Sequence, residues 1–254
     1  MKKHRYIIFV ITLSVTLQFC KKSDTVPTAP VNDYLPMQPG KYIHYRLDST
    51  LYVNFGQKDT TIYYDAKDVV DAEITDNLGR PAFRIVRYLR DTLSTNEGDY
   101  SASMSYVVTP SREGVDVTEN NLRFQKLKLP VTEAFTWRGN TYLPTAPYFD
   151  LYQFSNDEDI DKWDYTYQNV NQSAEVNGNF YDSTVTVLQQ ADSANVPIEF
   201  SDALAYRNYW VEQYSKNIGL VYKEVVMWEY QPPAAGNPGF ISGFGLKMRI
   251  IDHN

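Results

Sequence analysis

Apolar and polar side chains alternate along most of the chain beyond residue 40. A period of two, with many β-branched and aromatic residues, is typical of β-strands that bury one face. Turn-forming residues separate these stretches every ten to fifteen residues. The pattern predicts strands over residues 41–49, 66–75, 82–93, 100–109, 114–118, 122–129, 163–175, 180–190, 206–216, 220–230 and 243–252.

Three turns indicate that neighbouring strands run antiparallel. Asn177-Gly178 is a strong hairpin signal, and Asn217-Ile218-Gly219 and residues 76–81 separate two further strand pairs. Residues 207–214 also allow a helix, but their Tyr, Trp and Val content favours a strand.

Helices are expected to be few and short, with candidates at Glu158–Trp163 and Ser201–Tyr206. The fold class is therefore all-β and mainly antiparallel. We expect a single large curved sheet, arranged either as a half-barrel or as a sandwich.

The N-terminus has the pattern of an export signal. Residues 1–5 are basic and residues 6–17 are apolar. Twelve helical residues span roughly 18 Å, less than the roughly 30 Å hydrocarbon core, so this segment is too short to cross a membrane. We expect a signal peptide at residues 1–19, a flexible tether with Pro27 and Pro30 at 20–33, and a single β-rich domain at 34–254.

Leu17-Gln18-Phe19-Cys20 resembles a bacterial lipobox. The resemblance implies that a lipid is attached to Cys20. Because Cys20 is the only cysteine, the chain has no intramolecular disulfide, and acylation would consume its thiol. Lys21 stands where an Asp would retain such a lipoprotein in the inner membrane, so the resemblance implies the outer membrane, facing either the periplasm or the cell surface.

Three further passages resemble a family of Bacteroidota outer-membrane lipoproteins of unknown function. They are residues 34–42, 137–140 and 214–224. The resemblance implies a β-rich envelope protein and brings no activity with it.

Net charge narrows the range of partners. Removal of Lys2, Lys3 and Arg5 with the signal leaves 21 basic against 31 acidic residues. An acidic surface disfavours nucleic acid and anionic lipid headgroups as partners. Membrane attachment would then depend on the acyl chains.

No catalytic motif is recognisable in the sequence. The histidines are His4, His44 and His253, and neither a Ser-x-x-Lys nor a His-Glu-x-x-His motif occurs. We expect no cofactor. Asp157, Asp159 and Asp161 have the spacing of the first calcium-loop ligands, but Lys162 and Gln168 replace the required Gly and Glu. A weak calcium site is an alternative to a solvated acidic loop.

Aromatic residues are the strongest compositional feature, with 21 Tyr and 4 Trp. Tyr165, Tyr167, Tyr209 and Trp210 are candidates for a surface that stacks against a ligand. The alternative is that they fill the interior, because Tyr is a favoured strand residue.

Asp followed by Ser or Thr and a small or apolar residue recurs along the chain. These triplets resemble the O-glycosylation sequence of exported Bacteroidota proteins. Turn formation by Asp and Ser or Thr is the alternative explanation. The candidate acceptors are Thr25, Ser49, Thr60, Thr92, Ser183 and Ser193.

Together these features favour a membrane-anchored envelope lipoprotein with a non-catalytic domain. The domain would bind a glycan, a lipid-like ligand or an envelope protein, or act as a scaffold. The alternative is a carbohydrate-active hydrolase that uses a carboxylate pair. A continuous apolar groove under the sheet would favour a lipid-like ligand, whereas two nearby acids ringed by Tyr and Trp would favour the hydrolase.

Overall fold

The computed structural model describes residues 30–254, and these residues form one 12-stranded antiparallel sheet. The strand order is β6-β5-β4-β3-β2-β1-β12-β11-β10-β9-β8-β7. The strands are β1 (Tyr42–Val53), β2 (Lys58–Thr75), β3 (Pro81–Asp91), β4 (Ser101–Pro110), β5 (Gly114–Glu119), β6 (Leu122–Lys128), β7 (Thr136–Arg138), β8 (Asp164–Val176), β9 (Asn179–Ala194), β10 (Ala205–Ser215), β11 (Gly219–Gln231) and β12 (Phe240–His253). The prediction of an all-β antiparallel fold is confirmed.

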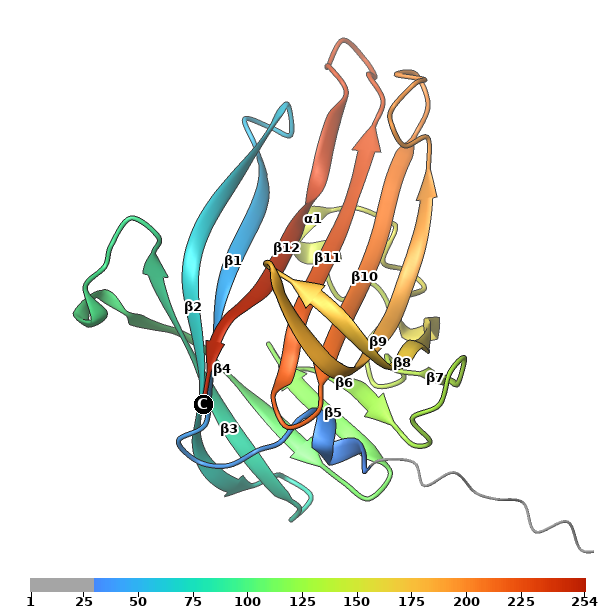
Figure 1. The fold of residues 1–254 in the computed structure, drawn as a ribbon. Coiled ribbons are helices and arrows are strands. Elements are labelled where there is room, and N and C mark those ends of the chain that lie inside the picture. Colours follow the sequence, from blue (N-terminus) through green and yellow to red (C-terminus); the bar gives the residue numbers. More distant parts are fainter. Residues whose placement is uncertain (1–29) are drawn as a thin grey trace, which may run out of the picture.

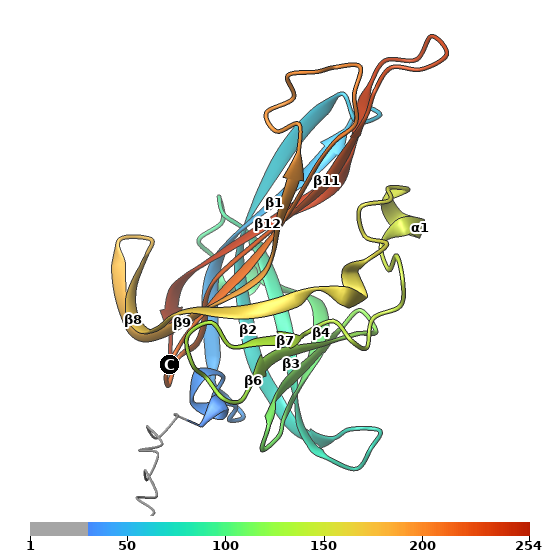
Figure 2. The same cartoon turned by 90° about the vertical axis from the view of Figure 1, so that its right-hand side faces the viewer.

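The sheet curls into a nearly closed barrel rather than folding into a sandwich (Figures 1 and 2). β1 and β12 pair at its centre, so the first and last strands of the chain lie side by side. The edge strands β6 and β7 approach each other. The backbone N–H of Gln125 donates to the carbonyl of Gly139 at 2.8 Å, and the indole N–H of Trp137 donates to the carbonyl of Gln125 at 2.8 Å.

The helices of residues 30–254 are all short. They are η1 (Val31–Tyr34), η2 (Glu97–Asp99), α1 (Phe149–Tyr152) and η3 (Ile160–Lys162). η3 lies within the predicted helix at 158–163, whereas the prediction of a helix at 201–206 was wrong, because β10 already begins at Ala205. Among the described residues, no helix has both the length and the apolar character needed to cross a bilayer.

η1 packs against one end of the barrel (Figure 1). Val31 and Tyr34 are buried in the main core, and the backbone N–H of Asn217 donates to the carbonyl of Asp33 at 2.7 Å. Val31 and Asp33, which the sequence places in the tether, are therefore part of the folded structure.

The hairpins β1–β2, β9–β10 and β11–β12 extend beyond the barrel at the opposite end from η1 (Figure 1). The loop between β7 and β8, which carries α1, lies to one side of β11 (Figure 2). This loop and the inner face of the sheet frame the candidate site. The predicted signal peptide, Cys20 and Thr25 lie outside the described residues.

Candidate ligand-binding groove

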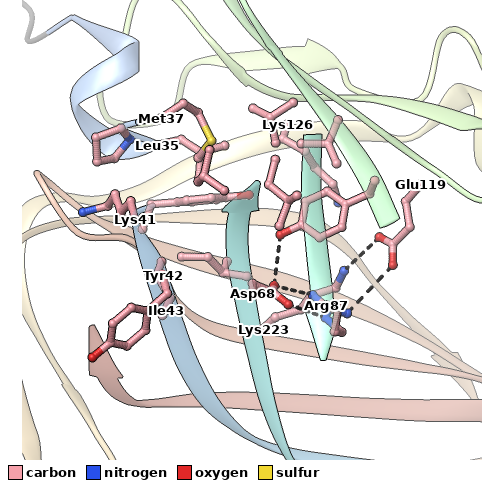
Figure 3. Close-up of a pocket in the computed structure, with 18 of the residues that line it drawn as sticks. Leu35, Met37, Lys41, Tyr42, Ile43, Asp68, Arg87, Glu119, Lys126 and Lys223 are labelled. Atoms are coloured by element: carbon pink, nitrogen blue, oxygen red, sulfur yellow. Dashed lines mark hydrogen bonds and ion pairs between the residues drawn. The ribbon is translucent and has the colours of Figure 1, made fainter. Parts of the chain in front are cut away.

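Charged residues from six strands meet inside the barrel, and we call them the charged cluster. They are Asp68 on β2, Arg87 on β3, Glu119 on β5, Lys126 on β6, Glu212 on β10 and Lys223 on β11. All six line one small cavity of about 70 Å³, which Leu35 and Met37 of the segment after η1 also line (Figure 3).

One half of the charged cluster is a bidentate ion pair. Nε and Nη2 of Arg87 donate to the two carboxylate oxygens of Asp68, each at 2.7 Å, and the hydroxyl of Tyr106 donates to Asp68 at 3.0 Å (Figure 3). Burial raises the pKa of Tyr106 well above its ordinary value, and the nearby carboxylate of Asp68 raises it further. The hydroxyl of Tyr106 therefore stays protonated and can only donate to the carboxylate.

The other half centres on Glu212, of which only 2% is exposed. Nζ of Lys126 donates to its carboxylate at 2.8 Å and the hydroxyl of Tyr214 donates at 2.7 Å. Burial by itself would raise the pKa of Glu212, but Lys126, Lys223 and Tyr214 outweigh it and lower the pKa to about 2. Glu212 is thus a carboxylate at every physiological pH.

Glu119 and Lys223 are held more loosely than the other members of the charged cluster. Nζ of Lys223 lies 3.6 Å from Glu212 and 4.0 Å from Glu119, and Nη1 of Arg87 lies 4.0 Å from Glu119. Within residues 30–254 neither side chain makes a hydrogen bond. Burial opposes the ionisation of Glu119, but Lys223, Arg87 and Lys126 lower its pKa. Both groups therefore keep hydrogen-bonding capacity.

A groove of about 300 Å³ lies beside Glu119 and Lys223. Glu119, Lys126 and Lys223 line both this groove and the small cavity, so the charged cluster forms the polar end of the groove. The other walls are mostly apolar and aromatic. They comprise Leu51, Leu122, Phe124, Tyr148, Leu151, Tyr152, Trp210, Val225, Phe244 and Leu246, together with Ser49, Asn120 and Gly245.

The loop that carries α1 supplies one wall of the groove. Its Tyr152 stacks on Phe244 of β12 with ring centroids 5.0 Å apart, and Tyr148 meets the same ring edge-on at 5.5 Å. The buried carboxylate of Asp157 fixes the loop by accepting a hydrogen bond from the backbone N–H of Tyr148 at 2.7 Å. Ser155 adds two hydrogen bonds to Glu229 of β11, each 3.0 Å long.

The four aromatic residues predicted to form a ligand surface do not lie together on one surface. Tyr165 and Tyr167 are fully buried in the core, where their hydroxyls bond to Asn140 and to the backbone of Lys128, so these two cannot stack against a ligand. Trp210 does line the groove, while Tyr209 is the half-buried neighbour on the opposite face of β10. Sequence alternation alone did not reveal which face of β8 was the inner one.

The acidic triplet is not brought together as a metal site. Asp157 points inward to Tyr148, whereas Asp159 forms an exposed ion pair with Lys162. Nowhere in the part of the chain that the structure describes do three or more His, Cys, Asp or Glu side chains form a group able to hold a metal ion. The calcium candidate of Asp157, Asp159 and Asp161 is not among the groups that these residues form.

The remaining sequence candidates lie outside the charged cluster. His44 bonds through Nε2 to the hydroxyl of Tyr100 at 2.8 Å, and burial lowers its pKa. Ser193 is exposed, whereas the other described glycosylation candidates are half-buried, namely Ser49, Thr60, Thr92 and Ser183.

Sequence reasoning missed the charged cluster entirely. Lys126 shares one strand face with Leu122 and Phe124, and Arg87 shares one with Phe83 and Ile85. A charged residue on an otherwise apolar face was the available signal. It remained ambiguous, because a partner on a distant strand must neutralise such a charge before it can be buried.

The class of protein that the fold and the groove define is a curled antiparallel sheet with a small interior groove. Neither a protein-family model nor a curated protein sequence matches the chain. Solved structures that are similar to it include the following two. An exported protein described as having a YmcC-like fold, from Bacteroides fragilis, is 13% identical with a TM-score of 0.35, over 85% of this chain and 98% of that one. A domain from Vibrio parahaemolyticus described as an outer membrane lipoprotein-sorting protein domain is 10% identical with a TM-score of 0.19, over 85% of each chain.

Proposed function

We propose that this chain is an exported lipoprotein, anchored in the outer membrane through Cys20, whose domain binds a small amphipathic ligand without catalysis. The observation that carries the proposal is the groove. Its volume of about 300 Å³ lies at the lower end of the range typical of small-molecule sites. Its aromatic walls and charged end would hold the two parts of an amphipathic molecule.

Fixed walls make the groove suited to binding. Phe244 and Trp210 come from the rigid sheet, and the α1 loop is tied down through Asp157. A preformed apolar site loses little conformational entropy when a ligand enters. A lipid-like ligand therefore fits better than a glycan, which would need an exposed row of polar and aromatic groups.

The carboxylates of the charged cluster are poorly suited to glycoside hydrolysis. Glu119 and Glu212 flank the same Lys223, but a general acid for this reaction needs a raised pKa. The pKa of Glu212 is lowered to about 2, and the pKa of Glu119 is also lowered. Neither group would hold a proton to give to a leaving sugar at neutral pH.

Substitution of the groove rim tests the proposal. Leu151 lies on α1, is 72% exposed and lines the groove, so Leu151→Gln should remove apolar contact without unfolding the protein. We expect the affinity for N-phenylnaphthylamine, an uncharged fluorescent dye, to fall about five-fold. A fluorescence titration of the purified chain measures this affinity.

Leu78→Gln is the matched control. Leu78 is 70% exposed in the turn between β2 and β3, and it does not line the groove. The control should bind the dye like the original protein. Absence of dye binding, or equal losses in the two variants, would contradict a ligand site in the groove.

A further inference from the structure

The charged cluster is electrically balanced. Arg87, Lys126 and Lys223 supply three positive charges, and Asp68, Glu119 and Glu212 supply three negative ones. Most of these side chains are buried, so any additional charge brought beside them would have no counterion. Burying such an unpaired charge is costly, because little water remains to solvate it.

Unused hydrogen-bonding groups lie at the end of the groove. Lys223 can donate and Glu119 can accept, since neither makes a hydrogen bond within the described residues. Both side chains line the groove, so a ligand head group placed there can contact them.

From this balance we infer that the ligand is an uncharged amphiphile whose head group carries hydroxyl or ester oxygens. A hydroxyl can donate to Glu119, and oxygens of the same head group can accept from Lys223, without adding net charge. The apolar part lies along Tyr148, Tyr152 and Phe244. The inference rests on the proposed binding function and names the chemical class of its ligand.

The free-energy cost of adding a charge should make an uncharged ligand bind more tightly than its ionic analogues. A carboxylate head would meet Lys223, but it would also face Glu119 in a poorly hydrated site. A quaternary ammonium head would meet the opposite conflict with Lys223. Like charges placed together at a binding interface repel each other, so both ions should bind more weakly than the uncharged molecule.

Competition against N-phenylnaphthylamine tests the inference with three amphiphiles of equal chain length. Monolauroylglycerol is uncharged, laurate is anionic and dodecyltrimethylammonium is cationic, and each is used below its micelle concentration at pH 8. We expect monolauroylglycerol to displace the dye at concentrations about ten-fold lower than either ion. Laurate or the cation binding as tightly would overturn the inference while leaving the proposed function standing. Failure of the dye and all three amphiphiles to bind would overturn both.

Glu119→Gln provides a second, independent readout. It removes one negative charge from beside Lys223 and leaves the charged cluster with one excess positive charge that an anion can balance. Laurate should then bind about ten-fold more tightly, while monolauroylglycerol should change less than about three-fold. Unchanged laurate affinity in the folded variant would overturn the inference.

Glu113→Gln is the matched control for this variant. Glu113 is exposed in the turn before β5, and it lines neither the groove nor the small cavity. It changes the net charge of the protein by the same amount without altering the charged cluster. An equal gain in laurate affinity in this control would show an effect of overall charge and would also overturn the inference.

Discussion

Glu212 illustrates how a single buried charge depends on its neighbours. Its carboxylate accepts from Lys126 and Tyr214 and lies near Lys223, so its lone pairs and its charge are both satisfied. Removing one partner of such a pair leaves the other charge buried without compensation, and that is the main source of the cost. The charged cluster therefore specifies how β6, β10 and β11 must face one another.

The pKa of Glu212 predicts acid sensitivity. Its pKa in the folded protein is about 2, below its ordinary value of 4.5. The ionised carboxylate therefore stabilises the fold above about pH 4.5, and this contribution is lost as the pH falls from about 4.5 towards 2. Urea unfolding at a series of pH values should show the decrease, and Glu212→Gln should flatten it while lowering stability at neutral pH by about 3–5 kcal/mol.

The control for this prediction is an exposed ion pair. Arg138 and Asp164 lie 2.8 Å apart with both side chains more than half exposed. Asp164→Asn should cost less than about 1 kcal/mol, because water screens such a pair. Similar losses for Asp164→Asn and Glu212→Gln would contradict a special role for the buried carboxylate.

At the scale of elements, the β11–β12 pair supports the groove wall that carries Phe244. Gly243 lies opposite Trp228 in this ladder with φ of +140°. A Cβ at this position would overlap the carbonyl oxygen of Met227 and lie 2.5 Å from Cα of Trp228. Only glycine allows β12 to pass β11 this closely.

Gly243→Ala should therefore destabilise the protein by at least about 3 kcal/mol, combining backbone strain with steric overlap. Gly236 in the loop between the two strands also has positive φ, at +81°, but a Cβ there would meet nothing within 4 Å. Gly236→Ala should lower the stability by only about 1 kcal/mol, because only the positive φ disfavours alanine there. Thermal unfolding measures the stability of both variants. Equal losses of stability would rule out a role for the close approach of β12 to β11 at Gly243.

At the scale of the whole molecule, the proposed lipid anchor, Cys20, precedes η1 in the sequence. Labelled palmitate should be incorporated into the original chain and should be lost in Cys20→Ala, which should also leave the membrane fraction. Retention of Cys20→Ala in that fraction would contradict lipid anchoring. An intact-mass measurement of the native protein would detect the acyl group and any glycan on the candidate Ser and Thr residues.

Local sequence signals determined much of the fold. Asn177 and Gly178 both adopt the positive φ that a tight hairpin turn requires, so this turn was readable from two residues. Strands with a regular alternation of apolar and polar residues, such as β1, were also predictable from the sequence. The first half of β2, from Lys58 to Asp65, and β7 were missed, because exposed or very short strands lack a clear two-residue period.

Local sequence signals did not predict the groove. Leu151, Trp210 and Phe244 are distant in sequence and meet only because the sheet curls and the α1 loop folds over it. Backbone conformation and hairpin pairing depend on neighbouring residues, so the sequence by itself determined most of the strands and their antiparallel hairpins. The inner face of each strand, the meeting of six charged side chains and the groove beside them depend on which strands close the barrel. Only the tertiary structure decided these features.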